Sequence, residues 1–198
     1  MTMILRTIFL AVSAAGILLA ASAPAFAQAR EAVPVKTGYA PVDGLKLYYE
    51  FYGTGAPLIL LHGGVGATEM FADILPQLSS NRRVIAVDLQ AHGRTADIDR
   101  PISYEAMADD IAALIKYLGL EKADVMGYSL GGGVALRVAI QHADVVRKLV
   151  LVSTAFKRDG WYPEILAGMS QMGPEAATPM KQTPMYQLYA RVAPRLAD

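Results

Sequence analysis

Short, almost continuously apolar runs recur along this chain, and each of them leads into glycine or a turn. The four clearest are Leu58–Leu61, Val84–Val87, Ala123–Tyr128 and Lys148–Val152. A strand that is apolar at nearly every position is typical of a parallel sheet, whose two faces are both covered by helices. Segments with helical spacing separate the runs. Short loops and right-handed crossovers then predict an α/β fold with a doubly wound, mostly parallel sheet.

Local patterns predict the other elements. An aromatic strand over 45–52 comes before the first run and enters a glycine-containing turn. Helices are predicted over 71–78, 104–118 and 130–141, and Ser103 can cap the second of them. We interpret residues 28–37 as a linker. Beyond Ala155 the pattern breaks into short helical pieces, and no further buried strand follows.

The composition excludes several classes of protein. Apolar residues make up 54% of the 198 residues and charged ones 18%, which is enough apolar surface for a core and not typical of disorder. Eighteen basic residues balance eighteen acidic ones, so nucleic acid is not an expected partner. The absence of cysteine excludes disulfides, thiolate metal sites and a cysteine nucleophile.

The first 27 residues resemble an export signal. Arg6 is their only charge, the stretch from Thr7 to Ala21 is almost entirely apolar, and Ala25-Phe26-Ala27 has small residues where a signal peptidase cleaves. We expect cleavage after Ala27 and a secreted or periplasmic product without stable membrane association. An uncleaved anchor is the alternative, because the uncharged stretch is just long enough to span a bilayer.

The most specific motif is Gly127-Tyr128-Ser129-Leu130-Gly131, a G-x-S-x-G between a predicted strand and a predicted helix. Glycines on both sides of the serine let the strand and helix approach closely, so the serine can occupy a strained turn with its hydroxyl exposed. The backbone N–H of Leu130 then points toward the same place from the positive end of the helix. Ser129 is therefore the predicted nucleophile, and Leu130 half of an oxyanion hole. A turn that serves packing alone is the alternative.

A second glycine motif, His62-Gly63-Gly64, follows the first buried run. Its loop can place another N–H opposite that of Leu130, and Gly64 is the predicted donor. We expect His62 to hold this loop through side-chain hydrogen bonds rather than to act in catalysis.

Three blocks, 58–66, 84–95 and 125–133, together resemble the α/β-hydrolase fold family, in its single-domain esterase, lactonase and haloperoxidase-like branch. The resemblance covers about residues 45 to 155. In the second block the family usually has glycine where this chain has Ala91, and His92 is expected to be a turn residue at the rim of the site. The resemblance implies that 28–155 form the N-terminal part of the hydrolase core and that 156–198 begin a helical cap, with the last two strands of the fold lacking.

The family's triad runs in the order serine, acid, histidine, and the last two follow the final strands. Here His62 and His92 precede the serine, and His142 lies about thirteen residues beyond it, roughly 20 Å along a helix. Asp124 begins a strand, at the end of the sheet opposite the site. Neither a triad acid nor a triad histidine is therefore expected in the 198 residues, and the strand over 148–152 is expected to be an exposed edge.

The resemblance implies hydrolysis of small carboxylic esters or lactones, and without its triad partners this chain is expected to have little of that activity. A cofactor-free haloperoxidase-like reaction at the same serine remains open. The alternatives from other classes are a catalytically inactive module that binds a small ligand and a truncated product without function.

The remaining features have alternative interpretations. Apolar side chains beyond Ala155 either line an acyl-binding cleft or fill gaps between short helices. They are Met169, Met172, Met180, Met185, Trp161, Tyr186 and Tyr189. Asp109 and Asp110 are expected to face water on the helix over 104–118, and no metal site is predicted. Neither glycine motif continues as a phosphate-binding or dinucleotide-binding loop, so no cofactor is predicted.

Overall fold

The computed structural model describes residues 34, 36–171, 173 and 177–193, and the predicted export signal lies outside them. Six strands form one sheet in the order β1-β2-β4-β3-β5-β6. The pairs from β4 through β3 and β5 to β6 are parallel, whereas β1 and β2 join as an antiparallel hairpin at the β4 side. The strands are β1 (Lys36–Val42), β2 (Leu45–Tyr52), β3 (Ala56–Leu61), β4 (Arg82–Val87), β5 (Ala123–Tyr128) and β6 (Val146–Val152). The predicted α/β fold with a mostly parallel sheet is confirmed.

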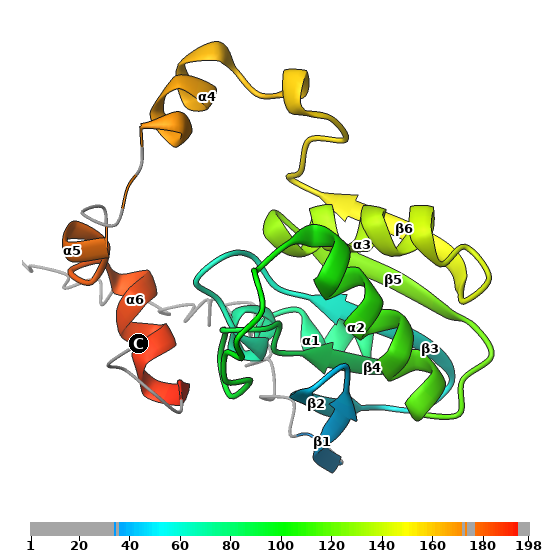
Figure 1. The fold of residues 1–198 in the computed structure, drawn as a ribbon. Coiled ribbons are helices and arrows are strands. Elements are labelled where there is room, and N and C mark those ends of the chain that lie inside the picture. Colours follow the sequence, from blue (N-terminus) through cyan, green and yellow to red (C-terminus); the bar gives the residue numbers. More distant parts are fainter. Residues whose placement is uncertain (1–33, 35, 172, 174–176, 194–198) are drawn as a thin grey trace, which may run out of the picture.

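Helices cover the two faces of the sheet unequally. The long helices α2 (Tyr104–Tyr117) and α3 (Leu130–Gln141) lie side by side on one face (Figure 1). The helix α2 begins at Ser103, whose side chain accepts a hydrogen bond from the N–H of Ala106 at 3.1 Å, as predicted. On the other face, the described part of the chain forms α1 (Leu75–Leu78), preceded by a 3-10 turn over Thr68–Phe71.

The strands alternate between two apolar clusters, as buried parallel strands must. Ile59, Leu61, Ile85 and Val87 pack into the larger cluster beneath α2 and α3. Their neighbours along the same strands, such as Leu58 and Val84, pack instead with Leu75 of α1. This double burial explains why β3 and β4 are apolar at consecutive positions.

Beyond β6 the residues that the structure describes form three short helices, which extend away from the sheet and then lie beside it again (Figure 1). They are α4 (Pro163–Ser170), α5 (Ala177–Met180) and α6 (Pro184–Val192), after a 3-10 turn over Arg158–Gly160. The strand β6 lies at the edge of the sheet, as predicted, and its Val150 and Leu151 are exposed. In the described part of the chain, no helix is both long and apolar enough to cross a bilayer.

The structure corrects three predictions. Residues 36 and 37 of the predicted linker belong to β1, because β2 offers them an antiparallel partner that local sequence could not reveal. The helix predicted over 71–78 is split, and only Leu75–Leu78 is α-helical. Asp110 does not face water: it is buried and accepts two hydrogen bonds from Arg100, at 3.0 and 2.7 Å. The loop before α2 folds back over the helix and carries this arginine, so helical spacing alone misplaced the carboxylate.

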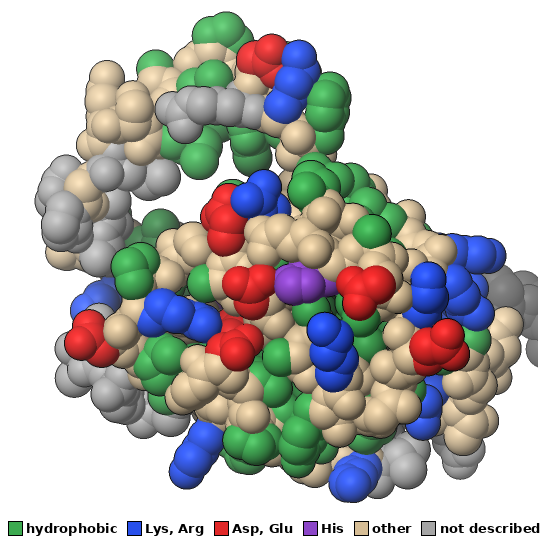
Figure 2. Space-filling model, turned by 45° about the vertical axis from the view of Figure 1, so that its right-hand side comes forward, with side chains coloured by type: hydrophobic (Ala, Val, Ile, Leu, Met, Phe, Trp, Pro, Cys, Tyr) green, Lys and Arg blue, Asp and Glu red, His purple; other side chains and the backbone are tan. Residues whose placement is uncertain are grey.

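Charges of both signs are interspersed over the surface. Figure 2 shows lysine and arginine side chains alternating with aspartate and glutamate on the face that it displays, without a continuous basic patch. Asp109, which was also expected to face water, is half exposed and contacts His142.

Candidate functional site

Ser129 occupies a strained turn between β5 and α3. Its backbone has φ 51° and ψ −113°, in a region that favours glycine. The chain must reverse here within one residue, because β5 ends at Tyr128 and α3 begins at Leu130. The predicted tight bend is therefore present, and the serine is half-buried at its apex. Within the described residues, its hydroxyl has no hydrogen-bond partner.

The two glycines of the motif are required by close backbone contacts. A Cβ atom on Gly127 would lie 2.0 Å from the carbonyl oxygen of Gly131, and one on Gly131 would lie 2.4 Å from the carbonyl oxygen of Leu61. The N–H of Gly131 donates to the carbonyl oxygen of His62 at 3.0 Å. The start of α3 thus packs directly on the ends of β3 and β5, which leaves no space for a side chain at Gly127 or Gly131.

This packing brings the second glycine motif against the serine. A Cβ atom on Gly63 would lie 3.4 Å from Cβ of Ser129, and one on Gly64 would lie 4.0 Å from Cβ of Leu130. The N–H of Leu130 is at the first position of α3, where no intrahelical acceptor exists. The two predicted oxyanion-hole residues, Gly64 and Leu130, therefore lie on adjacent backbone segments next to the predicted nucleophile.

His62 is fully buried beneath this loop and uses both ring nitrogens. Nδ1 lies 2.7 Å from the carbonyl oxygen of Gly63, and Nε2 accepts the N–H of Leu89 at 3.1 Å. An acceptor at Nε2 requires the neutral ring. Burial, helped by the nearby His92, lowers the pKa of His62 to about 3. The predicted structural role is confirmed, since His62 ties the loop after β3 to the loop after β4.

The loop after β4 is held by the buried carboxylate of Asp88. It accepts the N–H groups of Thr68 and Arg94, both at 2.8 Å, and pairs with the Arg94 side chain at 3.1 Å. Burial raises the pKa of Asp88 to about 6, against the lowering effect of these donors. Arg94 also pairs with Glu69 and lies over the ring of Tyr48. Sequence reasoning did not identify this ionic cluster, because its members come from three separate segments.

Two further residues next to the site have left-handed backbones. Val65, in the glycine loop, has φ 56°, and Ala91, in the loop after β4, has φ 59°. The family commonly has glycine at the position of Ala91. Alanine at this position therefore holds a left-handed backbone that glycine would adopt without steric strain. His92 follows it as a turn residue, as predicted, with Nδ1 2.8 Å from the carbonyl oxygen of Gln90.

We expect Ala91→Gly to stabilise the protein by about 0.5 to 1 kcal/mol. Glycine removes a left-handed penalty of about 1 to 2 kcal/mol, which its greater entropy in the unfolded chain partly offsets. Urea unfolding of the variant and the wild type measures the difference. Ala113→Gly, inside α2, is the matched control and should instead destabilise by up to about 1 kcal/mol. A loss of stability in Ala91→Gly would contradict the strain assigned to this loop.

No described side chain is placed to act as the base for Ser129. His142 ends α3 at the opposite end from Ser129, and its Nε2 contacts Asp109 at 2.7 Å. Asp124 lies at the start of β5, where it pairs with Arg82 and Arg147. Both placements agree with the predictions. In the described ranges, no group of three carboxylate or histidine side chains is arranged to hold a metal ion.

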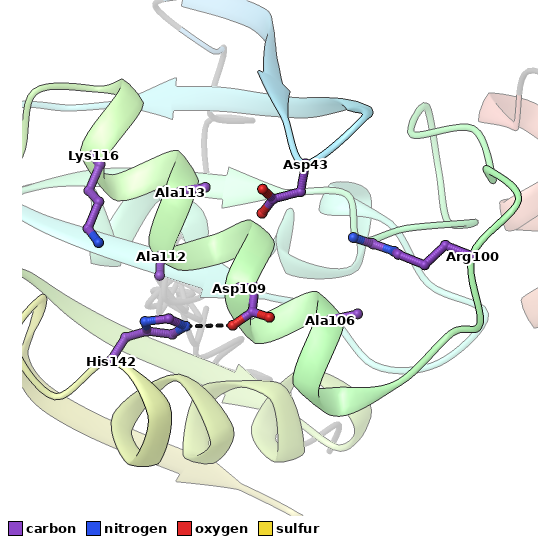
Figure 3. A pocket seen from close by; sticks show the side chains of 8 residues that line it. All are labelled: Asp43, Arg100, Ala106, Asp109, Ala112, Ala113, Lys116 and His142. Atoms are coloured by element: carbon purple, nitrogen blue, oxygen red, sulfur yellow. Dashed lines mark hydrogen bonds and ion pairs between the residues drawn. The ribbon is translucent and has the colours of Figure 1, made fainter.

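An open surface hollow lies elsewhere on the molecule, separate from Ser129. It has a volume of about 640 Å³ and lies beside α2, at the His142 end of α3 (Figure 3). Figure 3 shows Asp43, Arg100, Asp109 and Lys116 around it, so charges of both signs line an open surface. It contains no serine, and we do not assign the chemistry to it.

The apolar side chains beyond Ala155 are divided between two places. Met180, Tyr186 and Tyr189 line a cavity against the loop after β4, whereas Trp161 and Met169 line a groove along α3. Met172 lies outside the described residues, and the side chain of Met185 is not described. The position of α6 against the two strained loops could not be predicted, since nothing local in the sequence specifies which face α6 contacts.

Comparison with known proteins identifies the family. Residues 56–192 match the family described as "alpha/beta hydrolase fold". The chain belongs to the α/β-hydrolase fold family. Among curated relatives, the 2-hydroxymuconate semialdehyde hydrolase of Pseudomonas sp. (strain CF600) is 35% identical over 116 residues, which are 57% of this chain and 41% of that protein. A pimeloyl-[acyl-carrier protein] methyl ester esterase of Neisseria meningitidis serogroup B (strain H44/76) is 45% identical over 111 residues, 54% of this chain and 41% of the esterase.

Solved structures agree with this assignment. The epoxide hydrolase CorEH superposes with a TM-score of 0.65 at 28% identity, over 74% of this chain and 55% of the other. Est816, described as an N-acyl homoserine lactone degrading enzyme, superposes with a TM-score of 0.57 at 28% identity, over 69% and 52%. The chain spans about half the length of these proteins or less. The relatives are hydrolases with different substrates, so the family alone does not specify the reaction of this α/β hydrolase.

Proposed function

We propose that this α/β-hydrolase chain carries the nucleophile and oxyanion hole of a serine hydrolase that acts on small carboxylic esters or lactones. The main observation that supports this proposal is the strained backbone of Ser129 at the start of α3, with the Gly63-Gly64 loop packed against it. Relatives that are named as an ester hydrolase and as a lactone-degrading enzyme support this reaction class.

The proposed reaction is acyl transfer to Ser129. Its Oγ attacks the carbonyl carbon of the ester, and the carbonyl oxygen becomes an oxyanion between the N–H groups of Gly64 and Leu130. The C–O bond to the alcohol then breaks, and the proton lost by the serine leaves with the alcohol. Water hydrolyses the acyl-serine in the same way and releases the acid. The N-terminal end of α3 favours the negative charge at both stages.

We expect slow turnover from the described part of the chain, because none of its side chains is placed to act as a base for Ser129. A serine hydroxyl without a hydrogen-bonded base is a weak nucleophile near neutral pH, and the oxyanion hole alone supplies only part of the rate. The free hydroxyl of Ser129 is also the observation that favours the alternative of an inactive binding module.

Labelling with a fluorophosphonate tests the proposal, because this probe reacts with an activated serine hydroxyl. We expect slow labelling of the wild type at Ser129, located by peptide mass spectrometry, and none in Ser129→Ala. Ser153→Ala is the control, since Ser153 also has a left-handed backbone, with φ 52°, but lies beyond β6. It should label like the wild type.

A folded protein that remains unlabelled would argue against the nucleophile and favour the binding module. Labelling at another serine would contradict the site itself. If the protein is labelled, a peracid-dependent halogenation assay then distinguishes ester hydrolysis from the haloperoxidase-like reaction, which would use the same serine.

A further inference from the structure

Two small cavities lie between α6 and the glycine loop next to Ser129. One, of about 180 Å³, is lined by Val65, Ala91, Met180 and Tyr186 among others. The other, of about 160 Å³, is lined by Ala67, Met70 and Val192 among others. Both are bordered by Val65 and Tyr189, so they are neighbours around one tyrosine. Each is similar in size to an apolar cavity of about 150 Å³ that binds benzene, so each can hold a chain of about six carbon atoms.

Tyr189 fixes this arrangement. Its hydroxyl donates to the carbonyl oxygen of Ala91 at 3.3 Å, across 98 positions of the sequence, and its ring lies 5.8 Å from that of Tyr186. The loop that carries Val65 also carries Gly63, whose backbone abuts Ser129. The cavities therefore border the same loop that packs against Ser129.

Each cavity has a cation in its lining. Lys181 belongs to the first and Arg191 to the second, both side chains are exposed, and neither forms an ion pair within the described residues. The carboxylate in the second lining, Glu69, is already paired with Arg94. Burial lowers the pKa of His92 in the first lining, which disfavours its charged form. The balance of free charge around the two apolar cavities is thus positive.

We propose that these cavities form an acyl subsite for substrates with a short apolar chain that ends in a carboxylate. The apolar walls would take the methylene groups, and Lys181 and Arg191 would pair with the terminal charge at the mouth. The inference rests on the proposed ester-hydrolase function, since it identifies the acyl group that Ser129 would receive. It names a substrate class that neither the fold nor the nucleophile specifies.

A matched pair of amides tests the subsite without requiring turnover. The ligands are 6-(methylamino)-6-oxohexanoate and N-methylhexanamide, which have the same chain and differ in the terminal carboxylate. Their binding is measured by titration calorimetry on Ser129→Ala and on the same protein with Lys181→Gln and Arg191→Gln. We expect the carboxylate ligand to bind at least about tenfold more tightly in the first, and the preference to fall to about twofold or less in the second.

Lys116→Gln is the control, because Lys116 is an exposed cation on α2, away from both cavities. It should keep the full preference. Equal binding of the two ligands, a preference unaffected by removing Lys181 and Arg191, or no binding of either ligand would each overturn the subsite. Because none of these measurements requires Ser129, failure here with successful fluorophosphonate labelling would leave the proposed function standing. A preference for the carboxylate ligand without fluorophosphonate labelling would support the binding of a carboxylate at the cavities and argue against the proposed nucleophile.

Discussion

Gly131→Ala is expected to destabilise the protein by about 3 kcal/mol or more. The new methyl group would lie 2.4 Å from the carbonyl oxygen of Leu61 and 2.5 Å from that of His62. Both are backbone atoms at the end of β3, and neither can move without disturbing the sheet or the hydrogen bond from Gly131 to His62. Overpacking costs typically 1 to 3 kcal/mol where side chains can adjust, so a clash with fixed backbone belongs at the upper end or above it.

Urea unfolding, with circular dichroism as the signal, measures this change. Gly168→Ala is the matched control: a Cβ there meets nothing within 4 Å, and the position is inside the helix α4. Alanine should be neutral or stabilising by up to about 1 kcal/mol at that site. If Gly131→Ala were as stable as the control, the close packing of α3 on β3, and with it the position of Ser129, would be wrong.

The sequence predicted the layers of this fold because double burial leaves a local signature. Where β3 and β4 alternate between two apolar clusters, every position is apolar, and a run such as Leu58–Leu61 can be interpreted directly. The strand β1 leaves no such signature. It pairs with β2 on one side only and is half exposed, so residues 36 and 37 resemble a linker.

In the candidate site, the features that the sequence could predict are those that depend on backbone geometry. A turn with φ 51° at Ser129 and glycines without space for a Cβ produce a five-residue pattern that is visible in the sequence. Contacts between distant side chains produce none. The pairing of Asp110 with Arg100 and the contact of Tyr189 with Ala91 depend on how loops fold back, and spacing along one helix cannot show it.

The second large effect is expected at Asp88, in the loop after β4. Asp88→Ala removes the acceptor for the N–H groups of Thr68 and Arg94 and leaves the Arg94 guanidinium with one partner fewer. Unpaired buried donors cost about 1 to 3 kcal/mol, and breaking a buried ion pair costs about 3 to 5 kcal/mol, so we expect a total loss of about 3 to 5 kcal/mol in urea unfolding. Asp109→Ala, which removes a half-exposed carboxylate, is the control and should cost about 1 kcal/mol or less.

The gentler change Asp88→Asn tests the charge of the same residue through pH. The raised pKa of Asp88, about 6, means that the folded protein holds this proton more tightly than the unfolded chain, so its contribution to stability falls as pH rises from about 4 to 6. The lowered pKa of His62, about 3, has the opposite effect, because the unfolded chain binds that proton up to about pH 6.5. In the wild type the two slopes oppose each other over this range. In Asp88→Asn only the contribution of His62 to the pH dependence remains. The free energy of unfolding should therefore rise with pH more steeply in the variant, by up to about 1.4 kcal/mol per pH unit. Equal slopes for the two proteins between pH 4 and 6 would show that Asp88 is already ionised in the folded state throughout this range.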